Sequence, residues 1–146
     1  FFGRLKKILG GIEGIDIVGD RFVFSSEVLF DRGSAELGLA GKLQLDTISN
    51  VLKDISEKIP EDINWVLRVD GHTDRTPVGQ NSIFKDNWEL SQARSLSVVK
   101  YMINIHAIDP KRMSAAGFGE HQPISFSDSK EALAKNRRIE FKLTER

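Results

Sequence analysis

The feature that most constrains the fold is a long apolar stripe that stops at a proline. Apolar residues recur at three- and four-residue steps immediately before Pro60, namely Leu45, Ile48, Leu52, Ile55 and Ile59. This spacing places the side chains on one face of an α-helix, and Pro60 ends the helix because proline has no N–H to donate. Such a helix must bury its apolar face against another element. Residues 65–70, which include Val66 and Val69, predict a strand that follows this helix.

Further strands and helices are predicted on both sides of this pair. A second helix begins near Asp86, because Glu89 stands three residues later at capping-box spacing, and it runs to about His106. Its expected core stripe is Leu96, Val99, Met102 and Ile103. The remaining predicted elements are strands at residues 112–118 and 138–143 and a short helix at residues 130–135.

The N-terminal segment reads as a lead-in to this unit. Residues 1–9 have apolar residues at helical spacing, and residues 15–24 predict a hairpin around Gly19-Asp20. We expect residues 1–24 to pack on, or link to, a domain of residues 25–146. The predicted fold is α+β, an α/β sandwich in which helices pack on a mixed β-sheet.

Composition excludes several classes of protein. The chain has 146 residues, 21 Lys and Arg against 21 Asp and Glu, and no cysteine. Balanced charge argues against a nucleic-acid partner, because such proteins neutralise many phosphates. The lack of cysteine excludes disulfides and thiolate chemistry. No apolar run approaches the ~20 residues that span a bilayer, so we expect any membrane anchor to lie upstream of Phe1.

Two opposite charges are predicted to converge at one edge of the sheet. The strand ends in Gly71-His72-Thr73-Asp74, and Arg94 lies in the first turns of the next helix, on a strip with Asn87 and Ser91 that faces away from the core stripe. A carboxylate and a guanidinium at fixed separation suit a zwitterion. Spacing alone leaves open whether Asp74 and Arg94 instead pair with each other or with loop backbone.

Four motifs in order resemble a known family. They are Gly71-His72-Thr73-Asp74, then Asn87-x-x-Leu90-Ser91-x-x-Arg94, then Gly117-Phe118-Gly119-Glu120 with Pro123, then Asn136-Arg137-Arg138. Together they resemble the OmpA/MotB-like peptidoglycan-binding domain over residues 28–143. The long loop before Asn87-Trp88-Glu89 is more similar to the flagellar-motor stator branch. The resemblance implies a βαβαβ-type mixed sheet, no cofactor or metal, and non-catalytic binding of the peptidoglycan stem through diaminopimelate.

The resemblance also implies a role for each matching residue. Asp74 would hold the ammonium of diaminopimelate and Arg94 its carboxylate. Asn87 and Leu90 would line the pocket, Thr73 would make a backbone contact, Asp31 would border the pocket, and Arg138 would brace it. The protein would act in the periplasm, tethered to a membrane by a segment outside this chain, and a homodimer would attach more firmly.

Alternative functions remain open at this point. A metal-dependent cell-wall hydrolase would use His72 and Asp74, but the other histidines, His106 and His121, offer no third ligand at a matching spacing. We expect His72 to be a turn residue that hydrogen-bonds the loop. A protein–protein scaffold is the third possibility. Aromatic faces suit sugar rings, yet we expect Trp65 to pack in the core and Trp88 to clasp the helix start.

Overall fold

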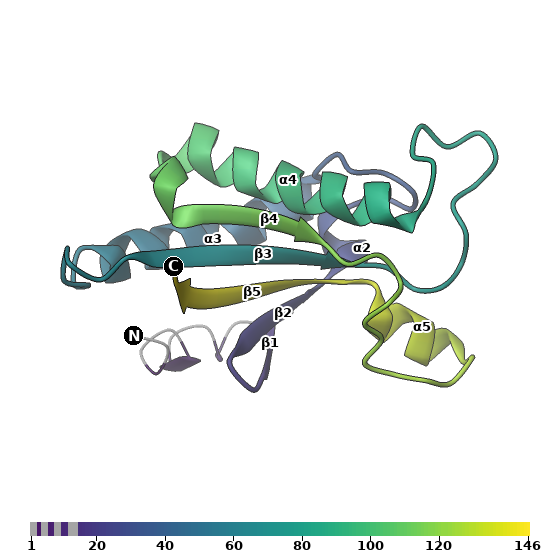
Figure 1. The fold of residues 1–146 in the computed structure, drawn as a ribbon, viewed down its shortest axis with the longest axis horizontal. Helices are drawn as coiled ribbons and strands as arrows, with labels where there is room; N and C mark the ends of the chain where they lie inside the picture. Colours follow the sequence, from purple (N-terminus) through teal and green to yellow (C-terminus); the bar gives the residue numbers. More distant parts are fainter. Residues whose placement is uncertain (1–2, 4–5, 8–9, 12–14) are drawn as a thin grey trace.

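The computed structural model describes residues 3, 6–7, 10–11 and 15–146, and these form helices packed on a five-stranded sheet (Figure 1). The strands are β1 (Ile15–Val18), β2 (Arg21–Ser25), β3 (Trp65–His72), β4 (Met113–Gly117) and β5 (Arg138–Glu145). The helices are α2 (Ser26–Leu29), α3 (Leu39–Ser56), α4 (Asn87–His106), the 3₁₀ turn η1 (Pro110–Arg112) and α5 (Lys130–Asn136). The predicted lead-in helix falls largely outside the described residues.

The sheet is mixed and has the order β1-β2-β5-β3-β4. Strands β3 and β4 are parallel, whereas β1–β2, β2–β5 and β5–β3 are antiparallel. This arrangement confirms the predicted α+β fold. The hairpin of β1 and β2 continues the sheet, since Phe22 stands opposite Phe141 of β5. The hairpin therefore packs on the domain, and the boundary at residue 24 stays a prediction.

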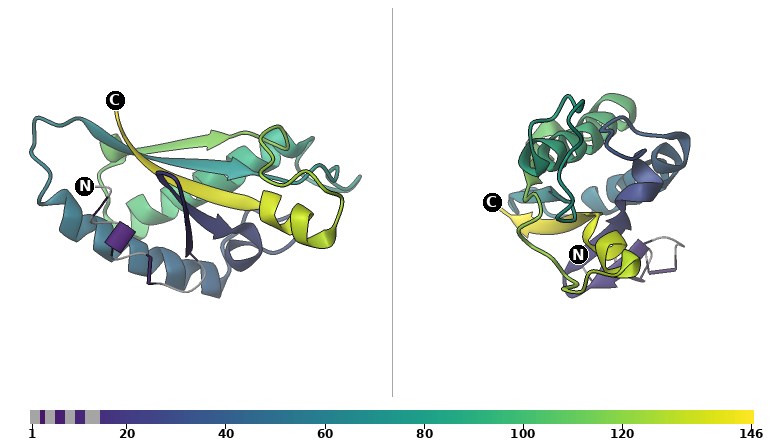
Figure 2. Two further views of the ribbon diagram at one scale, coloured as in Figure 1. Left: turned by 90° about the horizontal axis from the view of Figure 1, so that it is seen from below. Right: turned by 90° about the vertical axis from the view of Figure 1, so that its right-hand side faces the viewer.

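Helices α3 and α4 cover one face of the sheet, and the core lies between the two layers (Figure 2). Its fully buried side chains include Phe22, Phe24, Leu45, Leu52, Ile55, Val69, Val98, Met102, Ile139 and Phe141. Helix α3 ends at Ser56, four residues before Pro60. A tighter turn follows the helix, in which Ile59 N donates to Ser56 O three residues earlier. Ile59 still reaches the core from this turn. No helix among the described residues is long and apolar enough to cross a membrane.

The expected core stripe of α4 was partly wrong. Leu96 is 38% exposed, and Val98 is fully buried in its place, beside Val99 and Met102. The N-terminal half of α4 buries mainly polar residues, including Ser91, Arg94 and Ser95. The search for apolar residues at helical spacing therefore identified Val99, Met102 and Ile103 correctly, but it included Leu96 and missed Val98.

Two glycines let α4 lie directly on the ends of β3 and β4. A Cβ atom on Gly71 would stand 2.3 Å from Ser91 O, and one on Gly117 would stand 2.5 Å from Gln92 N. Both distances are far below van der Waals contact, so any other residue would push the helix away. These contacts fix the start of α4 against the end of β3, where the motif residues lie.

Candidate functional site

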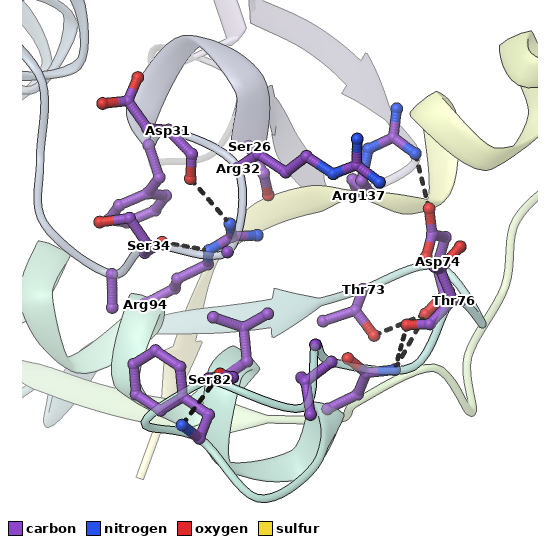
Figure 3. A pocket seen from close by; sticks show the side chains of 18 of the residues that line it. Ser26, Asp31, Arg32, Ser34, Thr73, Asp74, Thr76, Ser82, Arg94 and Arg137 are labelled. Carbon is purple, nitrogen blue, oxygen red and sulfur yellow. Dashed lines mark hydrogen bonds and ion pairs between the residues drawn. The ribbon is translucent and has the colours of Figure 1, made fainter.

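An open pocket with a volume of about 1400 Å³ lies where the end of β3 meets the start of α4. Loops at residues 31–36 and 75–86 form much of its rim (Figure 3). Six of the seven predicted site residues line this pocket, namely Asp31, Thr73, Asp74, Asn87, Leu90 and Arg94. The topology thus brings together residues that are up to 63 positions apart in the chain.

Asp74 lies at one wall of the pocket and is paired with Arg137. Its Oδ2 accepts from Arg137 Nη1 at 2.6 Å, and its Oδ1 accepts from Thr76 N at 2.8 Å. Arg137 also forms an ion pair with the exposed Glu27 of α2. A carboxylate has about four acceptor positions, so Asp74 can still accept from a ligand.

Arg94 forms the opposite wall and is 5% exposed. Its Nε donates to Ser34 O at 2.8 Å and its Nη2 to Asp31 O at 3.3 Å, and the guanidinium lies 5.3 Å from the ring centre of Phe30. Burial lowers the pKa of Arg94, the charge of Arg137 lowers it further, and Asp74 offsets part of this. These bonds use two of its five N–H groups.

The two charges do not pair with each other. Both bind loop backbone, as the alternative considered from the sequence allowed, and Asp74 also forms an ion pair with Arg137. The predicted outward strip of α4 needs correction, since Ser91 faces β4 and accepts from Gly119 N at 2.9 Å. The strip that lines the pocket consists of Asn87, Leu90 and Arg94, and the loop at residues 31–36 covers Arg94.

Asn87 connects the pocket floor to the neighbouring loops. Its Nδ2 lies within hydrogen-bonding distance of Thr76 O at 3.1 Å, Glu120 Oε1 at 3.3 Å and Asp74 O at 3.4 Å. Thr73 Oγ1 donates to the same Asp74 carbonyl at 2.8 Å. These bonds hold the turn after β3 against the start of α4, and so position the Asp74 carboxylate.

Capping fixes where α4 begins. Asp86 Oδ1 accepts from Glu89 N at 2.9 Å, as the spacing predicts. The return bond of the capping box is shifted by one residue, because Glu89 Oε1 accepts from Lys85 N at 3.2 Å. The loop before the helix is therefore tied to its first turn.

Arg138 lies apart from the other predicted site residues and is not among those that line the pocket. Its side chain is 3% exposed, pairs with Glu140 at 2.6 Å and donates to Asn136 O and Gln122 O. Residues 137 and 138 are adjacent, and Arg137 is the one that reaches Asp74. Sequence reasoning named the arginine pair and expected Arg138, at the start of the last strand, to brace the pocket. The strand does begin at Arg138, but it is Arg137 that lines the pocket.

His72 is not the turn residue that we expected. It ends β3, is buried, and stacks on Phe118 with ring centres 5.0 Å apart. Neither ring nitrogen has a hydrogen bond within the described part of the chain, although Nε2 lies 3.7 Å from Glu140 Oε1. Burial, with the charge of Arg138, lowers the pKa of His72 to about 4. Across residues 15–146 and the few described before them, no three His, Asp or Glu side chains gather as metal ligands.

Comparison with known proteins identifies the family of this chain. The model of the OmpA family matches residues 29–137, and the chain belongs to this family. Motility protein B of Bacillus subtilis is 37% identical over 113 residues, which cover 77% of this chain and 40% of that protein. The chain thus spans less than half the length of that relative.

Solved structures place the chain in the MotB-like branch, as the motifs predicted. A putative MotB-like protein from Desulfovibrio vulgaris superposes with a TM-score of 0.85 and 32% identity, covering 99% of this chain and 89% of that one. The periplasmic domain of Helicobacter pylori MotB superposes with a TM-score of 0.75 and 25% identity, covering 90% and 80%.

Proposed function

We propose that this domain binds the peptide stem of peptidoglycan without making or breaking a bond, and so anchors a membrane protein or motor-stator complex to the cell wall. The observation that carries the proposal is the pocket between Asp74 and Arg94. A carboxylate and a guanidinium face one cavity from opposite walls, and neither neutralises the other. Such a site is complementary to a ligand group that carries both charges.

The ligand group is the free end of a diaminopimelate residue, which presents an ammonium and a carboxylate on one carbon. The ammonium donates to Asp74, sharing it with Arg137, and the carboxylate accepts from the free N–H groups of Arg94. Leu90, on the same face of α4, contacts the methylene chain. Ser26 Oγ supports a polar ligand, because it lines the pocket, is buried, and has no hydrogen-bond partner among the described residues.

The domain acts in the periplasm, as does the H. pylori MotB domain with which it superposes. One such site binds weakly, because it grips a single amino-acid head group. Useful anchoring comes from rebinding to a polymer that repeats the stem, and dimerisation strengthens it by raising the effective concentration. The metal-dependent hydrolase has no ligand set in the described residues to support it.

Co-sedimentation with purified sacculi tests this function. Asp74→Asn keeps the shape of the side chain and an oxygen for Thr76 N, but it removes the charge that holds the ammonium. We expect this variant to stay in the supernatant while the wild type pellets. Asp62→Asn is the matched control, since Asp62 is exposed and lies before β3, at the other end of the strand. Equal pelleting of Asp74→Asn and the control contradicts the proposal.

A further inference from the structure

An exposed aromatic pair stands beside the pocket. Trp88 in the first turn of α4 is 51% exposed and stacks on His121, with ring centres 4.7 Å apart and planes inclined by 26°. His121 is itself exposed. The other tryptophan, Trp65, is 5% exposed and packs in the core. Trp88, which we expected to clasp the helix start, contacts His121 there and keeps half of its surface in water.

This pair adjoins the wall of the pocket. Trp88 directly follows Asn87, His121 directly follows Glu120, and Asn87 Nδ2 lies 3.3 Å from Glu120 Oε1. Successive residues of a helix point in directions about 100° apart, so Trp88 and His121 lie on the side of α4 adjacent to the side that faces the pocket. A ligand that occupies both places crosses the start of this helix.

The loop that carries His121 is held in place before any ligand binds. Gly119 N donates to Ser91 Oγ at 2.9 Å, and Gly119 O accepts from Thr73 N at 2.9 Å. Gly119 has a φ of +61°, which glycine adopts without strain. It also packs against the rings of Trp88 and His121, since a Cβ atom on this residue would lie 3.5 Å from each ring. A preorganised aromatic surface loses little entropy when it binds.

We propose that Trp88 and His121 bind a sugar ring of the glycan strand that carries the stem peptide. This inference rests on the proposed function. A pyranose ring presents a face of C–H groups with small positive charges, which complements the negative face of an indole ring. Glu120 precedes His121, and the exposed Gln92 lies one helical turn after Trp88. Each side chain makes one bond within the protein, Glu120 with Asn87 and Gln92 with Ala115 O, and has further polar atoms for sugar hydroxyls.

The chemistry of the wall makes this position suitable. The stem is attached to a muramic acid residue through its amino end, and two residues separate that attachment from diaminopimelate. Two extended residues span about 7 Å, to which the lactyl linker adds its own length. A sugar can therefore lie just outside the pocket that holds the diaminopimelate head, which is where the aromatic pair stands.

Titration with three defined ligands tests the inference: the stem tripeptide alone, the disaccharide-tripeptide, and a glycan without stems. In the wild type we expect the disaccharide-tripeptide to bind about two- to tenfold more tightly than the tripeptide, the range expected of one aromatic contact. Trp88→Ala should remove this gain and leave the affinity for the tripeptide unchanged. Trp88→Phe should keep part of the gain, because it retains an aromatic face.

The outcomes separate this inference from the proposed function. A gain that persists in Trp88→Ala overturns the sugar contact while the stem site stands. If the tripeptide does not bind but the stem-free glycan changes the fluorescence of Trp88, the diaminopimelate site is wrong and the sugar site is supported. If neither ligand binds, both fall. A self-association that Trp88→Ala abolishes, with no gain from the sugar, assigns the surface to a second copy and also overturns the inference.

Discussion

Asp74 and Arg94 line the same pocket, yet each is hydrogen-bonded to a different partner. Asp74 accepts from Arg137 at 2.6 Å, whereas Arg94 donates to the carbonyl oxygens of Ser34 and Asp31. A direct salt bridge between them would have to break before a zwitterion could bind. Because Asp74 and Arg94 form no such bridge, the zwitterion that we propose as ligand would meet two charges that are already oriented, one of them shared with Arg137.

Arg94 has a structural role besides the binding role that we propose, and two substitutions separate them. Arg94→Lys keeps the charge but loses the planar fork, so we expect about a tenfold or greater loss of affinity for the stem. Arg94→Ala also leaves the loop carbonyls without donors and should lower the free energy of unfolding by about 1–3 kcal/mol. Urea denaturation measures the second effect. An Arg94→Ala variant as stable as wild type would contradict the role of these bonds.

Gly71 should be intolerant of any side chain, because α4 lies directly on it. Gly71→Ala places a methyl group 2.3 Å from Ser91 O, and we expect a loss of about 1–3 kcal/mol in stability with weaker ligand binding, since Asn87 and Arg94 move with the helix. Gly79→Ala is the control, because Gly79 also lines the pocket but has open space around its Cα. Equal stability of the two variants would show that α4 does not lie this close to β3.

Tyr101 should titrate above its ordinary value, and it can be followed alone because the chain has one tyrosine. Its hydroxyl donates to Asp46 Oδ1 at 2.6 Å, and this bond is the main cause of a raised pKa of Tyr101. Absorbance of the phenolate at alkaline pH measures the value. We expect Asp46→Asn to return the pKa toward 10.0. No difference between the two proteins would mean that Asp46 does not hold α4 to α3.

The buried His72 should make the domain less stable in acid. Because its pKa is lowered to about 4 in the folded protein from 6.5, the unfolded chain binds the proton more readily. Stability is therefore complete above about pH 6.5 and falls as the pH drops from 6.5 toward 4, by about 3 kcal/mol at most. Urea unfolding at several pH values measures this loss.

Two variants separate His72 from the other titrating groups. We expect His72→Phe to lose much of this pH dependence, since phenylalanine can stack on Phe118 and does not titrate. His121→Gln, which changes an exposed histidine, should keep it. An unchanged pH dependence in His72→Phe would show that His72 is not the group responsible.

Most of the element order could be predicted from the sequence, because apolar spacing and capping are local. Trp65–His72 and Asn87–His106 were predicted to within about two residues. The directions of the side chains were harder to predict in the N-terminal half of α4 and at the start of β5. The buried face of α4 carries serines where it meets Gly71 and Gly117, and only the packed sheet reveals why small polar residues stand there.

The partner of Asp74 was missed for a similar reason. Arg137 and Arg138 are neighbours, and the start of the last strand at residue 138 was predicted correctly, but the face to which each side chain points was not. Arg138 is the first residue of that strand and points to the face with Glu140, which leaves Arg137 free to extend toward Asp74 and Glu27. The motif therefore indicated the pair, while the register of the sheet decided the role of each residue.

The most direct test of zwitterion recognition compares two stem tripeptides that differ only in the third residue. One carries diaminopimelate, and the other carries lysine, which has the same ammonium but no carboxylate beside it. Calorimetric titration of the wild-type domain should give at least about tenfold tighter binding of the diaminopimelate peptide, because only its carboxylate reaches the fork of Arg94. Arg94→Lys should reduce this preference. Equal affinity of the wild type for the two peptides would contradict the account.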